Sequence, residues 1–475
     1  MESIPYRGSG KVRIRGNDYS CSLYYSEQSE EIVLQIQVKN DVHIGNFLEV
    51  PLEIPFLCGE LETGFRFSVF NLNRINTNDN LNTGISTYTF EASYLIAGIG
   101  DPGNIEPLFN QVAYTISDIT QWGDQSIYEI GHDYGLFMRA NFPKETIYED
   151  DEFRIEYKVY GSFLPSEYDL AKDEISLSQR GTIHLYATKE CSLLRFNEVF
   201  QRIKELIDIA TLRNNAVEKV EAFSKEYVKV YGETTIEHPI DIYGRGIKKN
   251  DFNKDRIRLL SWILLPELVK RNSFKQYFEK FEKLAPIVEL LLELLSTKEM
   301  SEVRVFLNIV QALETYHSRF VTNDLKEYKK RVENLVSNEP VQNQESVRSF
   351  LMSSSKHHVC LESRLADLLL ANNTIRFDTG DIRLFDFPSV IAYTRHYFIH
   401  YDEKIRERNR VLSKEELSIY NRVLLHILEF YILFELGFDI NDAKMKSKLD
   451  FRWGNISREL NLKKTSQQIE KNTQA

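Results

Sequence analysis

The sequence is poor in cysteine and contains no long apolar run. Its 475 residues include four cysteines, and no two of them have C-x-x-C spacing. This scarcity excludes a disulfide framework and a cysteine-rich zinc cluster. No apolar segment approaches the ~18 uncharged residues that a membrane-spanning helix requires. Residues Met1–Arg7 also lack the basic and apolar regions of a secretory signal. These absences predict a cytoplasmic protein with no membrane partner.

Acidic residues outnumber basic residues, but unevenly along the chain. The sequence contains 59 Lys and Arg against 70 Asp and Glu, a net charge of -11. Residues 341–475 contain 20 basic and 18 acidic residues, so residues 1–340 carry a net charge of -13. An acidic protein is a poor nonspecific ligand of nucleic acid. The last third of the chain is nevertheless able to bind a polyanion.

The first part of the chain has the alternation of β-strands. One hydrophobic core supports roughly 250–300 residues, so this length predicts more than one domain. In Phe153–Val159 apolar and charged residues alternate, and Ile32–Val38 and Thr182–Tyr186 follow the same period. Residues 1–190 are therefore predicted to form a β-rich, sandwich-like or barrel-like domain with a sensor or regulatory role.

Helical periodicity begins near Cys191. Apolar residues then recur at helical spacing: Leu194, Phe196, Val199, Phe200, Ile203, Leu206, Ile207 and Ala210. Helices are predicted from here onward, as a middle region at 191–340 and a last domain at 341–461, joined by a polar linker at 337–344. Residues 462–475 lack an apolar face and are predicted to be a flexible tail. The predicted fold is α+β and multidomain, a β-rich N-terminal domain followed by an all-helical region.

The last domain contains two helices with clear start signals. Asp386-Phe387-Pro388 combines a capping acceptor with a proline of the first turn. Ser413 and Glu416 have the spacing of a capping box, so the next helix is expected to begin there. Residues 402–412 are then predicted to be a basic helix end and loop.

The first of these helices has polar residues away from its predicted core face. Helical spacing assigns to that face Val390, Thr394, Tyr397, Phe398 and Tyr401. Three polar residues lie off this stripe: Arg395, His396 and His400. They are left to face a groove or a partner molecule.

Arg395-His396-Tyr397-Phe398-Ile399-His400 resembles the R-[N/H/D]-x-x-x-H signature of HEPN-domain ribonucleases. With a β-rich N-terminal domain, a helical middle region and a C-terminal bundle, the whole chain resembles the ApeA family of bacterial antiphage defence proteins. The resemblance implies a HEPN-like four-helix bundle and metal-independent RNA cleavage at the interface of a homodimer or higher homo-oligomer formed through the HEPN domain. It also implies tRNA as the target, a phage-encoded trigger and abortive infection as the outcome.

The residue chemistry supports RNA cleavage without a cofactor or metal. RNA supplies its own nucleophile, the 2′-OH, so the enzyme needs only a base, an acid and a cation. We assign His400 as general acid or base, Arg395 as the phosphate clamp and His396 as a second polar contact. At about 100° per residue, Arg395 and His400 lie roughly 140° apart around one helix. Two copies across a twofold axis would supply them from both chains.

Several alternatives remain open from the sequence. Arg395, His396 and His400 could form a solvated or structural set, within a non-catalytic HEPN-like module that dimerises and binds protein. A metal site is a second possibility, because His396, His400 and Glu403 recur on one helix face. Two basic clusters could hold an RNA backbone or could simply be solvated. They are Lys404, Arg406, Arg408 and Arg410, and Lys444, Lys446 and Lys448.

Overall fold

A computed structural model of the chain separates into two compact units. We call residues 1–211 and 215–266 the strand-rich unit, and residues 212–214 and 267–475 the helical unit. The structure describes residues 7–26, 30–39, 50–80, 82–100, 105–117, 119–131, 137–140, 143–161, 179–231, 234–247, 263–297, 299–352, 355, 357–371, 386–439, 449 and 453–459. The predicted tail at 462–475 and the three lysines between 444 and 448 lie outside these ranges.

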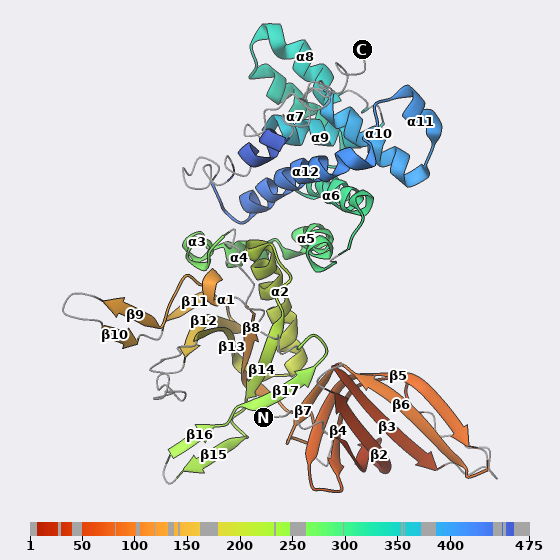
Figure 1. The fold of residues 1–475 in the computed structure, drawn as a ribbon, viewed down its shortest axis with the longest axis vertical. Helices are drawn as coiled ribbons and strands as arrows, with labels where there is room; N and C mark the ends of the chain where they lie inside the picture. Colours follow the sequence, from red (N-terminus) through yellow and green to blue (C-terminus); the bar gives the residue numbers. More distant parts are fainter. Residues whose placement is uncertain are drawn as a thin grey trace, which may run out of the picture. The chain divides into compact units, whose positions relative to one another are not determined.

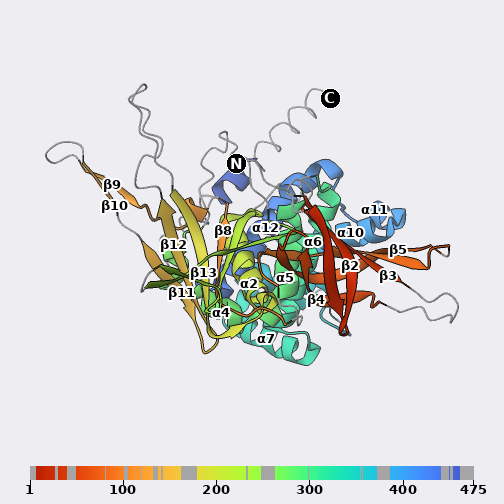
Figure 2. The ribbon, with the colours of Figure 1, turned by 90° about the horizontal axis from the view of Figure 1, so that it is seen from below.

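The strand-rich unit begins with antiparallel strands that close into a ring (Figure 1, red to orange; a second view is Figure 2). These strands are β1 (Arg7–Ile14), β2 (Asn17–Ser26), β3 (Glu31–Lys39), β4 (Glu53–Leu61), β5 (Arg66–Asn80) and β6 (Ile85–Ala92). They pair in the order β5-β4-β1-β2-β3-β6, and β6 pairs again with β5. On β3, Ile32, Leu34, Ile36 and Val38 are each at most 1% exposed. Their alternation places them in the core, and the ring is barrel-like rather than a sandwich.

Strand β5 joins this ring to a larger sheet. Its first half pairs with β7 (Tyr94–Ala97), whereas its second half pairs with β6. From β7 the sheet continues through β17 (Ile240–Gly244), β14 (Val217–Phe223), β8 (Phe109–Ile116), β13 (Gln179–Cys191), β12 (Phe153–Gly161) and β11 (Lys144–Glu149). Two further strand pairs are β9 (Tyr128–Gly131) with β10 (Phe137–Ala140), and β15 (Val228–Tyr231) with β16 (Thr234–Glu237). The four strands β14 to β17 show that the prediction of helices alone after Cys191 is wrong for this part.

Helix α2 (Leu193–Thr211) packs on β13 and β8 of the larger sheet, and the short helix α1 (Ile119–Trp122) also contacts β13. The ring of Phe200 stacks on that of Tyr114 with centroids 3.6 Å apart. The hydroxyl of Tyr114 donates a hydrogen bond of 2.8 Å to Oδ1 of Asn197. The predicted helical stripe is buried as expected, except that Leu193 rather than Leu194 is fully buried.

The helical unit is built around one long apolar helix. Its helices are α3 (Leu265–Lys270), α4 (Ser273–Glu279), α5 (Phe281–Ser296), α6 (Glu302–Tyr316), α7 (Leu325–Ser337), α8 (Val341–Met352), α9 (Leu361–Ala371), α10 (Phe387–His400), α11 (Glu403–Arg408) and α12 (Lys414–Glu435). Helix α12 packs along α6, and α10 contacts both α6 and α9, which gives a four-helix bundle. By length and composition α12 could cross a membrane, with a mean hydropathy of 1.3, but 78% of its apolar window is buried. Its apolarity is that of a core helix.

The segment at 337–344 is a short turn followed by the start of α8. Helices α7 and α8 share an apolar cluster whose members are Tyr328, Val332, Val336, Val347, Leu351, Val359 and Ala366. The turn joins two helices of one core, so the prediction of a linker between two domains at 337–344 is wrong.

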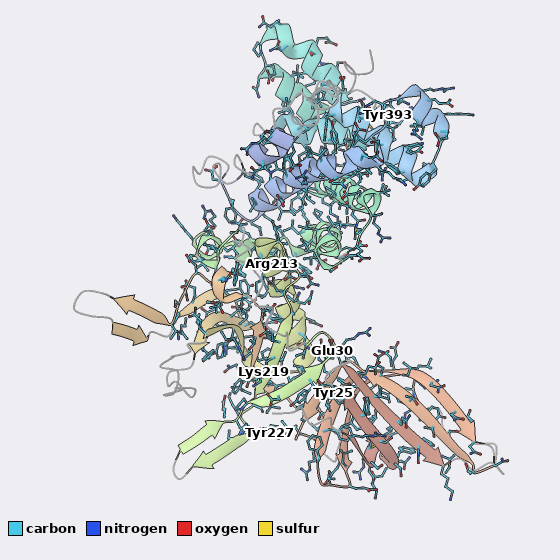
Figure 3. The ribbon with its side chains drawn as sticks, in the orientation of Figure 1. Tyr25, Glu30, Arg213, Lys219, Tyr227 and Tyr393 are labelled. Carbon is cyan, nitrogen blue, oxygen red and sulfur yellow. The ribbon has the colours of Figure 1, made fainter. Side chains whose placement is uncertain are left out.

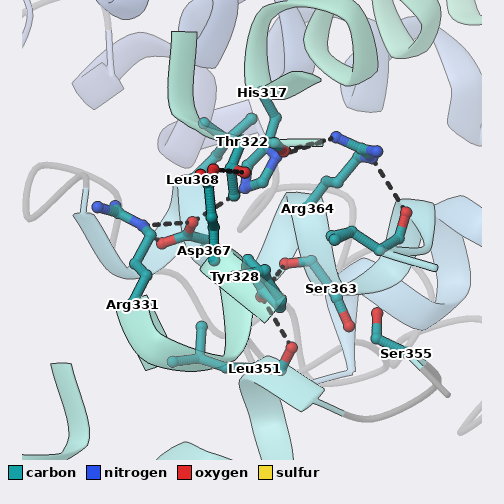
Figure 4. Close-up of polar contacts among 12 residues, drawn as sticks. His317, Thr322, Tyr328, Arg331, Leu351, Ser355, Ser363, Arg364, Asp367 and Leu368 are labelled. Carbon is teal, nitrogen blue, oxygen red and sulfur yellow. Dashed lines mark hydrogen bonds and ion pairs between the residues drawn. The ribbon is translucent and has the colours of Figure 1, made fainter. Parts of the chain in front are cut away.

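A buried polar network links the short π-helix η1 (His317–Val321), which follows α6 directly, with α7 and α9 (Figure 4). Asp367 accepts two hydrogen bonds from Arg331, of 2.8 and 3.1 Å, and one of 2.9 Å from Nε2 of His317. Nη1 of Arg364 lies 3.1 Å from Nδ1 of His317. Because a guanidinium can only donate, Nδ1 must accept, so the proton of a neutral His317 resides on Nε2. Burial lowers the pKa of His317, in agreement with this neutral form.

Candidate active site

Helix α10 begins where the sequence predicts. Asp386 is its N-cap residue and Pro388 lies in its first turn, where a missing N–H is tolerated. The Asp386 carboxylate does not make the capping hydrogen bond that the sequence predicts. Instead, the backbone carbonyl of Asp386 accepts a hydrogen bond of 2.8 Å from the hydroxyl of Ser389.

The buried face of α10 differs in part from its predicted stripe. Its buried residues are Phe387, Pro388, Val390, Ile391, Thr394 and Phe398. Tyr397 is half-buried and Tyr401 is 61% exposed. The assignment of Tyr401 to the core is wrong because the helix ends at His400 and Tyr401 adopts the left-handed conformation, with φ 51°. Helical spacing no longer sets the direction of its side chain.

A buried threonine fixes α10 to the chain that follows it. Oγ1 of Thr394 accepts a hydrogen bond of 3.0 Å from the backbone N–H of Leu412. Immediately after Leu412, Ser413 and Glu416 form the predicted capping box at the start of α12. Between these anchors, α11 replaces part of the predicted loop, because the Asp402 side chain caps it through the N–H of Lys404. The middle of the motif helix is thus anchored to the residue just before the N-cap of α12.

The three motif residues occupy two different parts of the surface of α10. His396 and His400 are exposed, and their ring centroids are 4.7 Å apart with the planes inclined by 52°. Arg395 lies on a flank of the helix, where its side chain is 34% exposed and its Nη2 is 3.2 Å from Oε2 of Glu314. The structure therefore brings the two histidines together and holds the arginine toward α6.

This arrangement offers the groups that phosphate chemistry requires. Two neighbouring imidazoles are groups that can act as general base and general acid in proton transfer. The ion pair with Glu314 engages one guanidinium nitrogen of Arg395, and the planar guanidinium has further N–H donors that can bind phosphate oxygens. Local sequence patterns gave no signal for Glu314, because it lies on a helix far upstream of the motif.

The residues proposed for a metal site do not converge. Glu403 accepts a hydrogen bond of 3.1 Å from the hydroxyl of Tyr397, and Arg406 lies 3.8 Å from it. Its carboxylate is therefore engaged away from His396 and His400. Among the described residues, no group of three or more His, Cys, Asp or Glu side chains is placed to hold a metal ion.

The basic residues after the motif differ in their surroundings. The guanidinium of Arg406 lies 5.8 Å from the centre of the Tyr397 ring. Arg410 pairs with the Glu416 carboxylate of the capping box. Lys404 and Arg408 are exposed on α11. The cluster at 404–410 is therefore not one uniform cationic surface.

Comparisons with known families match most of the chain. The family model described as ApeA N-terminal domain 1 matches residues 7–281, and that described as Apea-like HEPN matches residues 307–442. The second match begins within α6, before residue 341, and includes Glu314 as well as the three motif residues. No curated protein and no solved structure matches the chain.

Proposed function

Because the chain belongs to the ApeA-like family of antiphage defence proteins with a C-terminal HEPN domain, we propose that it is a metal-independent endoribonuclease whose substrate is tRNA. The observation that carries this proposal is the pair of exposed histidine rings on α10, 4.7 Å apart, with Arg395 on the same helix. A phage-encoded trigger would activate the enzyme in the cytoplasm, and the strand-rich unit would be its sensor.

The proposed reaction needs only these side chains and the RNA. One histidine accepts the proton of the 2′-OH as its oxygen attacks the adjacent phosphorus. The protonated imidazole then gives a proton to the leaving 5′-oxygen as the P–O5′ bond breaks. Arg395 stabilises the charge on the phosphorus oxygens, and His396 provides a second polar contact. The products are a 2′,3′-cyclic phosphate and a 5′-OH end, with no net consumption of water.

A homodimer completes the proposed site. Three large apolar or aromatic side chains are exposed on or next to the histidine-bearing end of α10: Tyr393, Ile399 and Tyr401 (Figure 3 labels Tyr393). Such side chains favour a protein partner, and a twofold axis beside them would bring two copies of the motif together. This pairing would place Arg395 of one chain near His400 of the other.

The proposal is tested by incubating the purified full-length protein with tRNA in the presence and absence of EDTA. Cleavage that persists with EDTA and leaves cyclic-phosphate and 5′-OH ends is the expected result. Cleavage that stops on chelation would overturn the metal-free mechanism. If the protein cleaves tRNA under neither condition, the alternative of a non-catalytic dimerisation and protein-interaction module is favoured.

Mixing two inactive variants tests whether one site uses both chains. Arg395→Ala and His400→Ala proteins are each expected to be inactive, whereas an equal mixture after subunit exchange should recover up to about one quarter of the wild-type activity. Half of the dimers are then mixed, and each of these holds one intact site. The activity of the mixture is compared with that of each variant mixed with itself.

A mixture that remains inactive would exclude a site built from Arg395 of one chain and His400 of the other. Sedimentation of the wild-type protein provides the more general check. A strictly monomeric protein that cleaves RNA would show that dimerisation is not part of the mechanism.

A further inference from the structure

A surface groove of ≈ 540 Å³ is lined by Tyr397 and Phe398, which stand between the two motif histidines in the sequence. Helices α10 and α11 and the first turn of α12 form its walls, and we call it the α10–α12 groove. The side chains that matter for its chemistry are those of Tyr397, Arg406, Asn409, Arg410, Ser413 and Lys414. Its volume falls within the range of about 300–1,000 Å³ that small ligands occupy.

The groove meets α10 at Tyr397 and at the buried Phe398, so Tyr397 is its accessible residue on this helix. Tyr397 precedes His400 by three residues, and side chains at this spacing are neighbours on a helix surface. At about 100° per residue, Tyr397 is nearly opposite Arg395 around the helix. A substrate that crosses α10 from Arg395 and passes over His400 therefore enters the groove at Tyr397.

The Tyr397 ring is held as a flat wall of the groove. Its hydroxyl donates to Glu403, and the guanidinium of Arg406 lies 5.8 Å from the ring centre. These contacts fix the ring on two sides while the side chain stays half-buried. A fixed, partly exposed aromatic ring is a surface on which a nucleobase can stack.

The remaining lining of the groove favours an anion. Three of its side chains are cationic, Arg406, Arg410 and Lys414, against one carboxylate, Glu415. Lys414 is also the first residue of α12, a helix of 22 residues whose positive end lies at the groove. Arg410 pairs with Glu416 and Arg406 lies 3.8 Å from Glu403, so we take Lys414 as the lining cation that contacts the phosphate.

The groove thus combines an aromatic ring on which a base can stack with cationic side chains that can bind a phosphate. Tyr397 also neighbours His400, the proposed proton-transfer group. These groups suit one nucleotide of a single strand. We propose that the α10–α12 groove binds the nucleotide next to the scissile phosphate of single-stranded RNA, with the base on Tyr397 and the phosphate at Lys414. This inference rests on the proposed ribonuclease function and adds a substrate subsite to it. It also divides the basic cluster at 404–410: Arg406 and Arg410 line the groove, whereas Lys404 and Arg408 do not.

Binding is measured with a fluorescently labelled single-stranded RNA oligonucleotide. All proteins carry His400→Ala, so that cleavage does not interfere with the titration. Adding Lys414→Ala should weaken binding and reduce the slope of log K against log salt by about 0.7, the value for one lost phosphate contact on a single strand. Lys404→Ala is the matched control, because Lys404 is exposed in the same connection but does not line the groove.

The aromatic wall is tested separately. Tyr397→Leu should weaken binding about 5- to 100-fold through the loss of stacking, whereas Tyr397→Phe should retain most of the affinity. Circular dichroism of both variants checks that the helical unit is folded. If either variant is unfolded, the Lys414 and Lys404 pair still decides the question, because both side chains lie on the surface.

The inference is overturned if Lys414→Ala and Lys404→Ala weaken binding equally, or if neither changes it. Equal weakening of RNA binding by the two variants would indicate general electrostatic attraction. If neither variant changed RNA binding, the groove would bind another ligand, such as an acidic protein segment. Failure of the proposed function has a different signature. In that case the protein with His400 intact neither cleaves nor binds RNA.

Discussion

Replacing His400 with alanine is expected to reduce RNA cleavage by about 10²–10⁴-fold, the usual loss for a general acid or base. The imidazole is exposed and its described ring contact is with His396, so little packing is lost. Surface substitutions of this kind usually change the free energy of unfolding by less than about 0.5 kcal/mol. Single-turnover cleavage and thermal unfolding, measured on the same preparation, test both parts of this prediction.

His357→Ala provides a matched control for the loss of an exposed histidine. His357 is exposed in the helical unit but lies outside the motif, so its replacement should leave cleavage and stability unchanged. The assignment of His400 would be wrong if His400→Ala kept full activity. It would equally be wrong if the variant lost activity only because it failed to fold.

Replacing Asp367 with alanine is expected to destabilise the helical unit by about 3–5 kcal/mol, the usual cost of removing one partner from a buried ion pair. Asp367 is 1% exposed and accepts hydrogen bonds from both His317 and Arg331. Its removal leaves the guanidinium and the imidazole N–H without their acceptor. Such a loss is a large fraction of the roughly 5–15 kcal/mol that stabilises a typical domain.

Urea unfolding followed by circular dichroism measures this effect. Asp367→Asn should cost less, because the amide oxygen can still accept one of the hydrogen bonds. Glu345→Ala is the control for an exposed carboxylate, since Glu345 pairs with Arg348 at the surface. If Asp367→Ala unfolded at the same urea concentration as Glu345→Ala, the buried network would not stabilise the unit.

The same network predicts how acid affects stability. Burial lowers the pKa of His317 below its ordinary value of 6.5, so the unfolded chain takes up this proton first and stability falls as the pH drops below 6.5. Burial raises the pKa of Asp367, but hydrogen bonds from His317 and Arg331 outweigh it and lower that pKa below 3.8. The stability contributed by Asp367 is therefore retained until the pH falls below 3.8.

Short-range signals in the sequence predicted those parts of the fold that local chemistry determines. The alternation in Ile32–Val38 gave β3, and the Ser413–Glu416 spacing gave the capping box of α12. Strand β14 was missed because Val217–Phe223 has no regular alternation, and its strand conformation depends on pairing with β8 and β17. Pairing between distant segments is a tertiary effect that a local pattern does not contain.

The same distinction applies to the candidate site. The helix that carries Arg395, His396 and His400 could be predicted because its start signal and its apolar spacing are local. The ion pair between Arg395 and Glu314 could not, because α6 and α10 are far apart in the sequence. The α10–α12 groove also depends on α11, whose six residues are too few for hydrophobic periodicity to indicate a helix.

The exposure of His396 and His400 has a consequence for how this protein can evolve. The side chains that hold α10 in place, such as Thr394 and Phe398, lie on the opposite face from the histidines. A missense change at position 400 would therefore produce an intact, abundant protein that is silent rather than one that is cleared by proteolysis. If the protein is the ribonuclease proposed above and its activity is toxic to the cell, such alleles would spread without a folding defect.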